Sequence, residues 1–332
     1  MAIEHQYLLF LGDAADQLAA KTAQGIAHWR PEWCLGQIRL AGCNADLGLT
    51  EMTLTKAVEA GARTLVVGVA NRGGVISHDW IDILEKALIM GLDLAAGLHS
   101  RLADVPSLAS IAEQHGRRLF DVRHTTRSFQ VGTGKRRPGK RLLTVGTDVS
   151  CGKMYTALAL EKELRARGMK ADFRATGQSG ILIAGDGVSV DAVIADFISG
   201  ATEWLAPAND PDHWDVIEGQ GSLFHASYAG VSLGLLHGAQ PDALVLCHEP
   251  TRAHMRGLPD YPLPGLKDCI ALNLEAARLT NPDVSAVGVA INTSAMPAGE
   301  ARALLEDIES DLDLPTVDSF KDGVAPIVDR LR

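Results

Sequence analysis

Residues 142–154 read LLTVGTDVSCGKM, and this stretch predicts the fold around it. An apolar strand runs directly into a loop that opens at Gly146, closes at Gly152 and is followed by Lys153. Residues 152–168 are rich in Ala, Leu, Glu and Lys and end at a glycine, a pattern typical of a helix. Strand, glycine loop, lysine and helix in this order are the context in which such a loop binds phosphate.

The chemistry of the loop explains this prediction. Glycine lets the backbone turn tightly with no Cβ in the way, so that successive N–H groups point into one concavity. The helix N-terminus adds partial positive charge, and the lysine adds a full one. We therefore predict that a phosphate-bearing cofactor binds to nine consecutive residues, which are Gly146, Thr147, Asp148, Val149, Ser150, Cys151, Gly152, Lys153 and Met154.

The loop departs in two ways from the usual nucleotide-binding pattern. Five residues, not four, separate Gly146 from Gly152. The position after the lysine, normally Ser or Thr and a Mg²⁺ ligand, is Met154, and the next hydroxyl belongs to Thr156. A thioether does not replace a hydroxyl on a hard cation. The loop is therefore expected to hold phosphates without organising ATP and Mg²⁺.

Apolar segments alternate with amphipathic ones on both sides of residues 129–140, which is the pattern of parallel sheets covered on both faces. In the first half, strands are expected at 7–11, 35–40, 64–69, 92–96 and 118–122, and helices at 14–29, 52–60, 79–90 and 106–115. After the phosphate loop, strands are expected at 170–175, 214–218, 242–247, 285–291 and 314–317, and helices at 188–199, 266–279 and 298–310.

These patterns predict an α/β protein of two domains. Residues 1–128 are expected to form a small Rossmann-like doubly wound domain, and residues 141–332 a P-loop NTPase-like parallel α/β domain. Residues 129–140 carry several glycines and basic side chains without apolar periodicity, which favours a linker. The alternative is that its cations help to neutralise a phosphate, namely Lys135, Arg136, Arg137 and Lys140.

Composition excludes several classes of protein. A formal net charge of −10 disfavours nonspecific binding of nucleic acid or anionic lipid. The five cysteines lack paired C-x-x-C spacing, so neither a disulfide framework nor a metal site is expected. No apolar run approaches the roughly 18 residues needed to cross a bilayer, and no leader is visible. We expect a cytoplasmic homo-oligomer that acts on a small molecule.

The Gly-Thr-Asp opening of the loop, with its extra residue, resembles dethiobiotin synthetase and related P-loop proteins. Residues 215–221, DVIEGQG, look like the Val-Glu-Gly-Ala-Gly segment of that family. The resemblance implies that Glu218 lies near the bound phosphates. The alternative is that Glu218 is a salt-bridge partner within a loop.

Three further segments are similar to the D-glutamate N-acetyltransferase family, formerly a domain of unknown function. They are 174–181 (RATGQSGI), 217–252 (IEGQGSLFHASYAGVSLGLLHGAQPDALVLCHEPTR) and 291–295 (INTSA). The segments around 44–46 and 71–74 are similar too, so that the resemblance covers nearly the whole chain. It implies transfer of an acetyl group from acetyl-CoA to the α-amine of D-glutamate or a related acidic amino acid, in D-amino-acid catabolism.

This implied chemistry agrees with the residues. CoA carries a pyrophosphate and a 3′-phosphate, which the loop could hold without Mg²⁺. An amine that attacks a thioester needs a base, oxyanion donors and cations for the substrate carboxylates. Glu218 and His225 are the candidate bases, with Glu218 preferred because an isolated histidine is more often structural. Cys151 could form an acyl intermediate, but small loop filler is the preferred interpretation.

Substrate binding is expected from residues that follow strand ends, the edge at which open α/β sheets place ligands. Guanidinium groups meet carboxylates in a bidentate fork, although each arginine could equally form a surface salt bridge. The candidate substrate-binding residues are Arg174, Gly177, Gln178, Ser179, Gly180, Gln220, Ser222, Tyr228 and Arg252.

Other interpretations stay open at this stage. The Gly-Thr-Asp loop is compatible with an ATP- and Mg²⁺-dependent ligase or kinase of the dethiobiotin synthetase type, which Met154 disfavours. A nucleotide-binding regulator without chemistry is a third possibility. The segment 71–74, NRGG, is interpreted as a chain turn or as a ligand contact.

Overall fold

The computed structural model describes residues 3–69, 76–125 and 127–331, and the chain divides into two compact units. The first unit comprises residues 1–126 together with 177–192, and the second comprises 127–176 and 193–332. The expected segment 71–74 lies outside the described residues. Two-domain α/β architecture, with parallel sheets, agrees with the fold class expected from the sequence.

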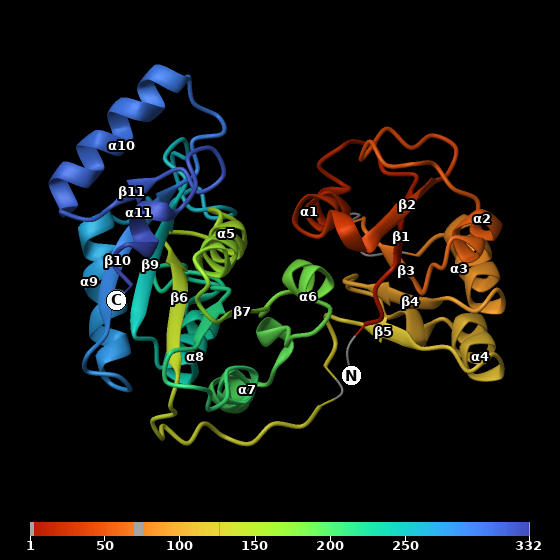
Figure 1. The fold of residues 1–332 in the computed structure, drawn as a ribbon, viewed down its shortest axis with the longest axis horizontal. Helices are drawn as coiled ribbons and strands as arrows, with labels where there is room; N and C mark the ends of the chain where they lie inside the picture. The colour runs from red at the N-terminus through yellow and green to blue at the C-terminus, as the bar shows by residue number, and fades with distance from the viewer. Residues whose placement is uncertain (1–2, 70–75, 126, 332) are drawn as a thin grey trace. The chain divides into compact units, whose positions relative to one another are not determined.

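Within the first unit, the described residues form a five-stranded parallel sheet of order β2-β1-β3-β4-β5 (Figure 1). This is the doubly wound order of flavodoxin-like folds. Every residue of β1 is buried, as expected for an inner strand covered on both faces. The strands are β1 (Tyr7–Gly12), β2 (Cys34–Arg39), β3 (Thr64–Val67), β4 (Asp93–Ala96) and β5 (Leu119–Asp121). The helices between them are α1 (Lys21–Trp29), α2 (Leu54–Glu59), α3 (His78–Ile89) and α4 (Pro106–Gln114).

Residues 177–192 return from the second half of the sequence to complete this unit. Their helix α6 (Gln178–Ala184) packs against α1, and the hydroxyls of Ser179 and Thr22 hydrogen bond at 3.0 Å. Arg123 fixes both ends of the segment, donating to Gln178 at 2.6 Å and to Asp191 at 2.9 Å. Since α6 supplies a helix that the first 126 residues do not contain, the expected boundaries of 128 and 141 omit an element of the first unit.

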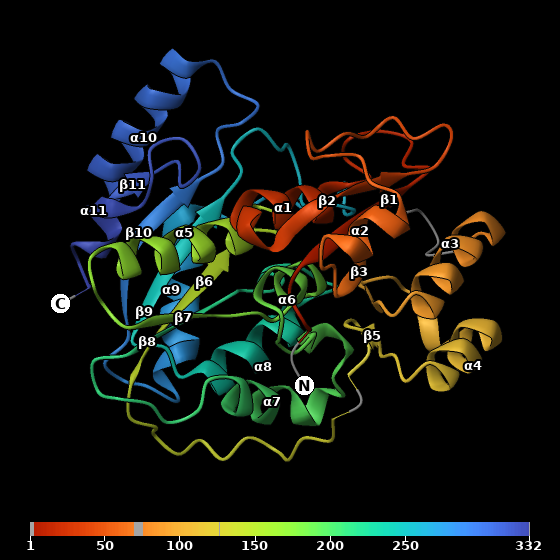
Figure 2. The same ribbon diagram turned by 45° about the vertical axis from the view of Figure 1, so that its right-hand side comes forward.

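Within the second unit, the described residues form a six-stranded parallel sheet of order β11-β10-β9-β6-β8-β7, whose arrangement Figure 2 shows from another side. Helices α5 and α11 cover one face, and α8 and α9 cover the other. The strands are β6 (Lys140–Gly146), β7 (Ala171–Arg174), β8 (Trp214–Ile217), β9 (Ala243–His248), β10 (Ser285–Ile291) and β11 (Thr316–Val317). The helices are α5 (Lys153–Ala166), α7 (Ile198–Leu205), α8 (Ala229–Ala239), α9 (Leu266–Arg278), α10 (Ala298–Leu312) and α11 (Ala325–Val328).

The topology of this sheet positions the functional site. Strand β6 lies between β8 and β9, and all three run parallel. Their carboxyl ends therefore meet at one edge, which brings Gly146, Glu218 and His248 to the same side of the sheet. The central strands are apolar and buried because both faces carry helices.

The structure departs from the expected elements in several places. The helix expected at 14–29 begins only at Lys21, because the preceding residues form turns in which Asp16 accepts the amide of Ala19. The helix expected at 188–199 is replaced by two short 3₁₀ turns, and α7 follows them. Helices α6, α8 and α11 were not expected at all.

Helix α8 was not predicted from the sequence because it is largely apolar around its whole circumference and contains three glycines. Two of them allow close packing on α7. A Cβ at Gly234 would lie 2.8 Å from Ile198 Cγ2, and one at Gly238 would lie 2.3 Å from the carbonyl oxygen of Ser199. Glycine usually weakens a helix, so that this pattern reads as a loop unless the neighbouring helix is known.

Among the described residues, no helix is long and apolar enough to span a membrane.

Candidate functional site

The loop between β6 and α5 has the geometry of a phosphate-binding loop. Ser150 and Gly152 adopt positive φ values of 51° and 109°, which fold the loop back on itself before α5 begins at Lys153. The Lys153 side chain is buried, and its ammonium group donates to the carbonyl oxygen of Asp148 at 2.7 Å. A Cβ at Gly146 would lie 2.7 Å from the sulfur of Cys151, so that only glycine fits there. The ammonium group is thus held inside the loop, beside the helix N-terminus.

Cys151 fills the inside of this loop. Its side chain is 1% exposed, and its thiol donates to the carbonyl oxygens of Asp148 at 3.2 Å and Cys247 at 3.3 Å. Two further buried thiols lie in the same core, and burial raises the pKa of both Cys247 and Cys269 to about 12. These contacts favour loop filler over the acyl-cysteine interpretation.

No hydroxyl follows Lys153 at the position where Mg²⁺ would be bound. Met154 is half-buried there. The Thr156 hydroxyl, two positions later, is buried and hydrogen bonds to Ser319 at 3.0 Å. Among the described residues, no group of three or more His, Cys, Asp or Glu side chains is arranged to hold a metal ion.

Glu218 is buried where β8 ends, next to the strand that leads into the loop. Its Oε2 accepts the amide of Thr176 at 2.9 Å, and the Thr176 hydroxyl donates to the Glu218 carbonyl at 2.6 Å. Gly219 approaches β6 closely, since a Cβ there would lie 1.7 Å from the carbonyl oxygen of Thr144. The backbone on both sides of this carboxylate is therefore fixed, and the carboxylate itself is bonded to the Thr176 amide.

The two other polar residues expected in this segment are also bonded to protein groups. Gln220 donates to the Thr176 hydroxyl at 3.1 Å. Ser222 donates to the carbonyl oxygen of Thr147 at 3.1 Å and thereby ties the segment after β8 to the phosphate loop.

His225 is 1% exposed, and both of its ring nitrogens are engaged. Its Nε2 lies 3.1 Å from the carbonyl oxygen of Arg256, and its Nδ1 accepts the amide of Ser227 at 3.2 Å. Tyr228, which is 46% exposed, packs against the imidazole with ring centroids 4.6 Å apart. With no nitrogen lone pair left, the imidazole is poorly placed to accept a proton from a substrate.

Arg252 grips the phosphate loop itself. One of its terminal nitrogens donates to the Asp148 carboxylate and to the carbonyl oxygen of Val149, both at 2.6 Å. The other donates to the carbonyl oxygen of Ser150 at 2.7 Å, and Nε pairs with Glu249 at 2.8 Å. The guanidinium that was expected to bind a substrate carboxylate is therefore largely occupied by the protein.

Arg174 is likewise paired within the second unit, with Asp215 at 2.7 Å and Asp172 at 3.5 Å. Gly177, Gln178, Ser179 and Gly180 belong to the first unit, where the side chains of Gln178 and Ser179 bond to Arg123 and Thr22.

The basic linker lies at the opposite end of β6 from the phosphate loop, because Lys140 is the first residue of that strand and Gly146 the last. Arg137 donates to the carbonyl oxygens of Ala206 and Gly238 and pairs with Glu203. Burial lowers the pKa of Arg137 to about 10, as expected of a cation in a packed environment. This position favours a structural role for the linker over a phosphate contact.

Sequence reasoning missed two residues next to the loop, His248 and Arg256. The His248 ring ends β9 and its Nδ1 lies 2.9 Å from the hydroxyl of Thr147. Burial lowers the pKa of His248, while the neighbouring Glu249 opposes the shift. The only sequence signal for either residue was its place shortly after a strand end.

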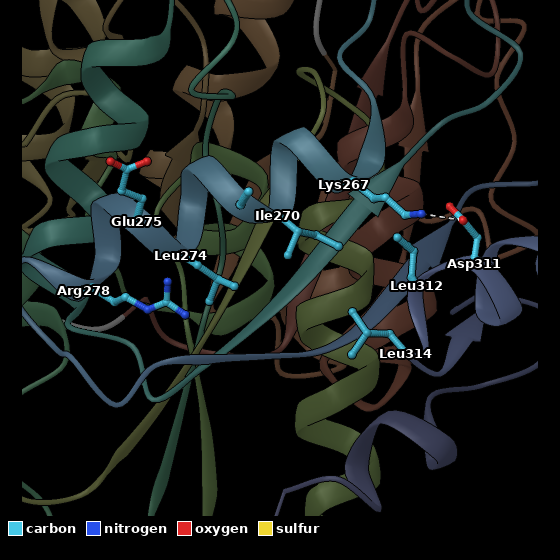
Figure 3. Close-up of a pocket in the computed structure, with 9 residues that line it drawn as sticks. Lys267, Ile270, Leu274, Glu275, Arg278, Asp311, Leu312 and Leu314 are labelled. Carbon is cyan, nitrogen blue, oxygen red and sulfur yellow. Dashed lines mark hydrogen bonds and ion pairs between the residues drawn. The ribbon is translucent and has the colours of Figure 1, made fainter.

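A groove of about 540 Å³ lies elsewhere in the second unit, between α9 and the end of α10 (Figure 3). Leucines and Ile270 line its floor, and an ion pair between Lys267 and Asp311 closes one end at 2.5 Å. It contains none of the loop residues, and we do not assign the phosphate site to it.

Comparison with known proteins covers both units. A family model described as the P-loop domain of DUF1611, a domain of unknown function, matches residues 130–328, and one described as its Rossmann-like domain matches residues 38–125. A crystal structure of a DUF1611 family protein from Anabaena variabilis superposes with a TM-score of 0.85 at 31% identity, over 98% of this chain and 99% of that one.

Two curated relatives match along their whole length. A protein of Tritonibacter scottomollicae named D-glutamate N-acetyltransferase is 58% identical over 99% of both chains. A protein of a Pseudoalteromonas species with the same name is 49% identical over 100% of both.

Proposed function

Because this chain belongs to the DUF1611 family, together with its relatives named D-glutamate N-acetyltransferase, we propose that it transfers the acetyl group of acetyl-CoA to the α-amine of D-glutamate. The observation that carries the reaction is 58% identity to such a relative over 99% of both chains. The donor is inferred from the chemistry of the phosphate loop.

The loop fits a substrate that brings phosphates without Mg²⁺. Its amides, the N-terminus of α5 and the Lys153 ammonium form an anion site, and the hydroxyl that would complete a Mg²⁺ site is missing at Met154. The phosphates of CoA satisfy both conditions. An ATP-dependent ligase, the alternative, would need the metal ligand that Met154 does not provide.

In the proposed reaction, the neutral amine of D-glutamate attacks the thioester carbonyl carbon. The C–N bond forms, the C–S bond breaks, the CoA thiolate leaves, and one amine proton passes to a base. We assign the base to Glu218, because its carboxylate is buried directly after β8, next to the strand that leads into the loop.

His248 is the second candidate for the base. Its pKa lies below the usual value because of burial, so that the imidazole is neutral near pH 7 and can accept a proton. Its contact with Thr147 fixes the ring against the loop.

Incubation of the protein with acetyl-CoA and a panel of D- and L-amino acids tests the reaction, with release of free thiol as the signal. We expect thiol release that depends on D-glutamate and needs no Mg²⁺. Phosphate release from ATP and Mg²⁺ in a parallel reaction, without amino-acid-dependent thiol release, would favour the ligase instead.

A further inference from the structure

The geometry points to Arg256 as a residue that binds a phosphate group of the CoA substrate beside the loop at 146–153. This inference rests on the proposed function for the identity of the ligand. It begins with two buried polar side chains, Asp148 and His225, whose purpose the reaction itself does not explain.

Asp148 is 1% exposed and directs its carboxylate at the backbone of Arg256. One oxygen, Oδ2, accepts the Arg256 amide at 2.9 Å and the Arg252 guanidinium at 2.6 Å, and Oδ1 accepts the amide of Val149 at 2.7 Å. Burial alone would raise the pKa of Asp148, but the bonds from the Arg256 amide and the Arg252 guanidinium hold it below its usual value. The carboxylate is therefore ionised and committed to protein groups.

His225 holds the same residue from its other side. Because Nδ1 accepts the amide of Ser227, the ring proton lies on Nε2, which donates to the Arg256 carbonyl oxygen at 3.1 Å. Asp148 and His225 thus bond both backbone polar groups of one exposed residue. Burying two polar side chains costs free energy, so we take their bonds to Arg256 as a sign that the position of this residue is important for binding.

The turn around Arg256 is fixed as well. Met255 is 2% exposed, its amide donates to the Tyr261 carbonyl, and its own carbonyl accepts the Leu258 amide. The backbone of Arg256 is consequently held between a buried side chain and a closed turn.

The side chain of Arg256, in contrast, is exposed, and within residues 3–69, 76–125 and 127–331 its guanidinium makes no hydrogen bond or ion pair. The guanidinium of Arg252, four residues earlier, is bonded to Asp148, Glu249 and two loop carbonyl oxygens. The protein therefore uses Arg252 to hold the loop and fixes the backbone of Arg256, whose guanidinium is not bonded to the protein, next to the loop residue Asp148.

The charge of CoA explains why a second cation is needed beside the loop. The CoA tail carries a pyrophosphate and a 3′-phosphate, more anionic charge than Lys153 alone neutralises. A chain of net charge −10 must supply further cations locally. Guanidinium is the group best matched to phosphate oxygens, which it meets with two parallel N–H donors.

Calorimetric titration with CoA tests the inference in the full-length protein, using Arg256→Gln, Arg256→Lys and a matched control, Arg302→Gln, on the exposed face of α10. We expect roughly 10-fold weaker CoA binding or more in Arg256→Gln, since charge-assisted hydrogen bonds carry about 1.5–3 kcal/mol. Arg256→Lys should recover part of the affinity because it restores the charge, and the control should bind like the wild type.

Dephospho-CoA separates the two kinds of phosphate. If Arg256→Gln weakens CoA binding but leaves dephospho-CoA binding unchanged, the 3′-phosphate is the partner; if both weaken, the pyrophosphate is. Equal CoA affinity in wild type and Arg256→Gln overturns the inference, as does a change confined to the KM for D-glutamate. Because CoA binding needs no turnover, a wild type that binds CoA without acetyl transfer would refute the proposed reaction and leave this inference standing.

Discussion

At the scale of single residues, buried polar side chains around the loop divide into those that hold the backbone and those that can react. His225 and Ser222 bond to loop or turn backbone, and Arg252 bonds to two loop carbonyl oxygens and to the carboxylates of Asp148 and Glu249. Glu218 directly follows β8 and His248 ends β9, at the edge of the sheet where open α/β folds place ligands. Polar residues that look equivalent in the sequence therefore have different roles.

Glu218→Gln and His225→Gln distinguish these roles. If Glu218 is the base, as proposed, Glu218→Gln should lower kcat by about 10²–10⁴-fold, while the amide oxygen can still accept the Thr176 amide. Glutamine at 225 can place an N–H near the former Nε2 and keep the bond to Arg256, so that its kcat should stay within a few fold of wild type. Steady-state kinetics measure both, and a collapse of kcat in His225→Gln alone would reverse the assignment.

The pH dependence of stability tests the carboxylate of Asp148. Because its folded pKa lies below the unfolded value of about 3.9, it stabilises the protein above that value and loses this contribution as pH falls through the folded pKa. Asp148→Asn should therefore be less stable than wild type at pH 7, with a difference that shrinks below about pH 4. Urea unfolding from pH 7 to pH 3 measures this, with Asp307→Asn on α10 as the exposed control; a constant difference would contradict it.

The loop was predictable at this scale because its chemistry is local. Strand, glycines and Lys153 are contiguous in sequence, and they are contiguous in the structure. The partners of Arg252 and His225 are not: they lie 104 and 31 residues away. Sequence spacing contains no information on such contacts, so that Arg252 could be placed at the right edge of the sheet but not given its partner, and Arg256 was overlooked.

At the scale of elements, helix α8 is held by its glycine face. Gly234 and Gly238 meet α7 at distances that leave no room for a methyl group, whereas a Cβ at Gly230 meets nothing within 4 Å. The same residue type in one helix therefore has opposite consequences at different positions.

Gly238→Ala should destabilise the protein by about 1–3 kcal/mol, because the added methyl would lie 2.3 Å from the Ser199 carbonyl and force α7 and α8 apart. Gly230→Ala, the matched control, should be neutral or stabilise by up to about 1 kcal/mol through helix propensity. Urea unfolding of both variants measures the free energies. Equal effects at the two positions would show that propensity, and not helix contact, decides.

Most strands were predictable because buried parallel strands are runs of apolar residues, and β1, β6, β9 and β10 are such runs. The start of α1 could not be predicted, because the apolar residues between 14 and 29 are spaced as in a single helix although the first of them lie in turns. Helix α6 is seven residues long, and its stability comes from packing on α1 rather than from its sequence.

At the scale of the whole molecule, the chain passes between its two units three times, near residues 126, 176 and 192. The sequence indicated two domains and the class of each. It did not indicate that residues 177–192 return to the first unit, because such an excursion of the chain has no local sequence pattern. Its apolar residues, 181–183, are equally suited to either unit. The expected homo-oligomer stays a prediction, to be measured by sedimentation at assay concentration.

The excursion predicts how truncated proteins behave. A fragment of residues 1–128 lacks α6 and should leave the face of α1 that Ser179 contacts open to water. We expect it to aggregate or to lack a cooperative thermal transition. Joining residues 177–192 to it through a flexible linker should restore the transition, as circular dichroism can follow, and a fully cooperative shorter fragment would contradict the assignment of α6.

The same excursion constrains biosynthesis. During translation, the first 126 residues leave the ribosome well before residues 177–192, which complete the first unit. The surface that α6 covers in the folded protein therefore stays exposed while strand β6 and the phosphate loop are synthesised. Maturation of the amino-terminal unit is thereby coupled in time to translation of the cofactor loop. The part of the gene that encodes residues 1–126 therefore does not encode a complete first unit, and its duplication or exchange alone would deliver an unfinished product.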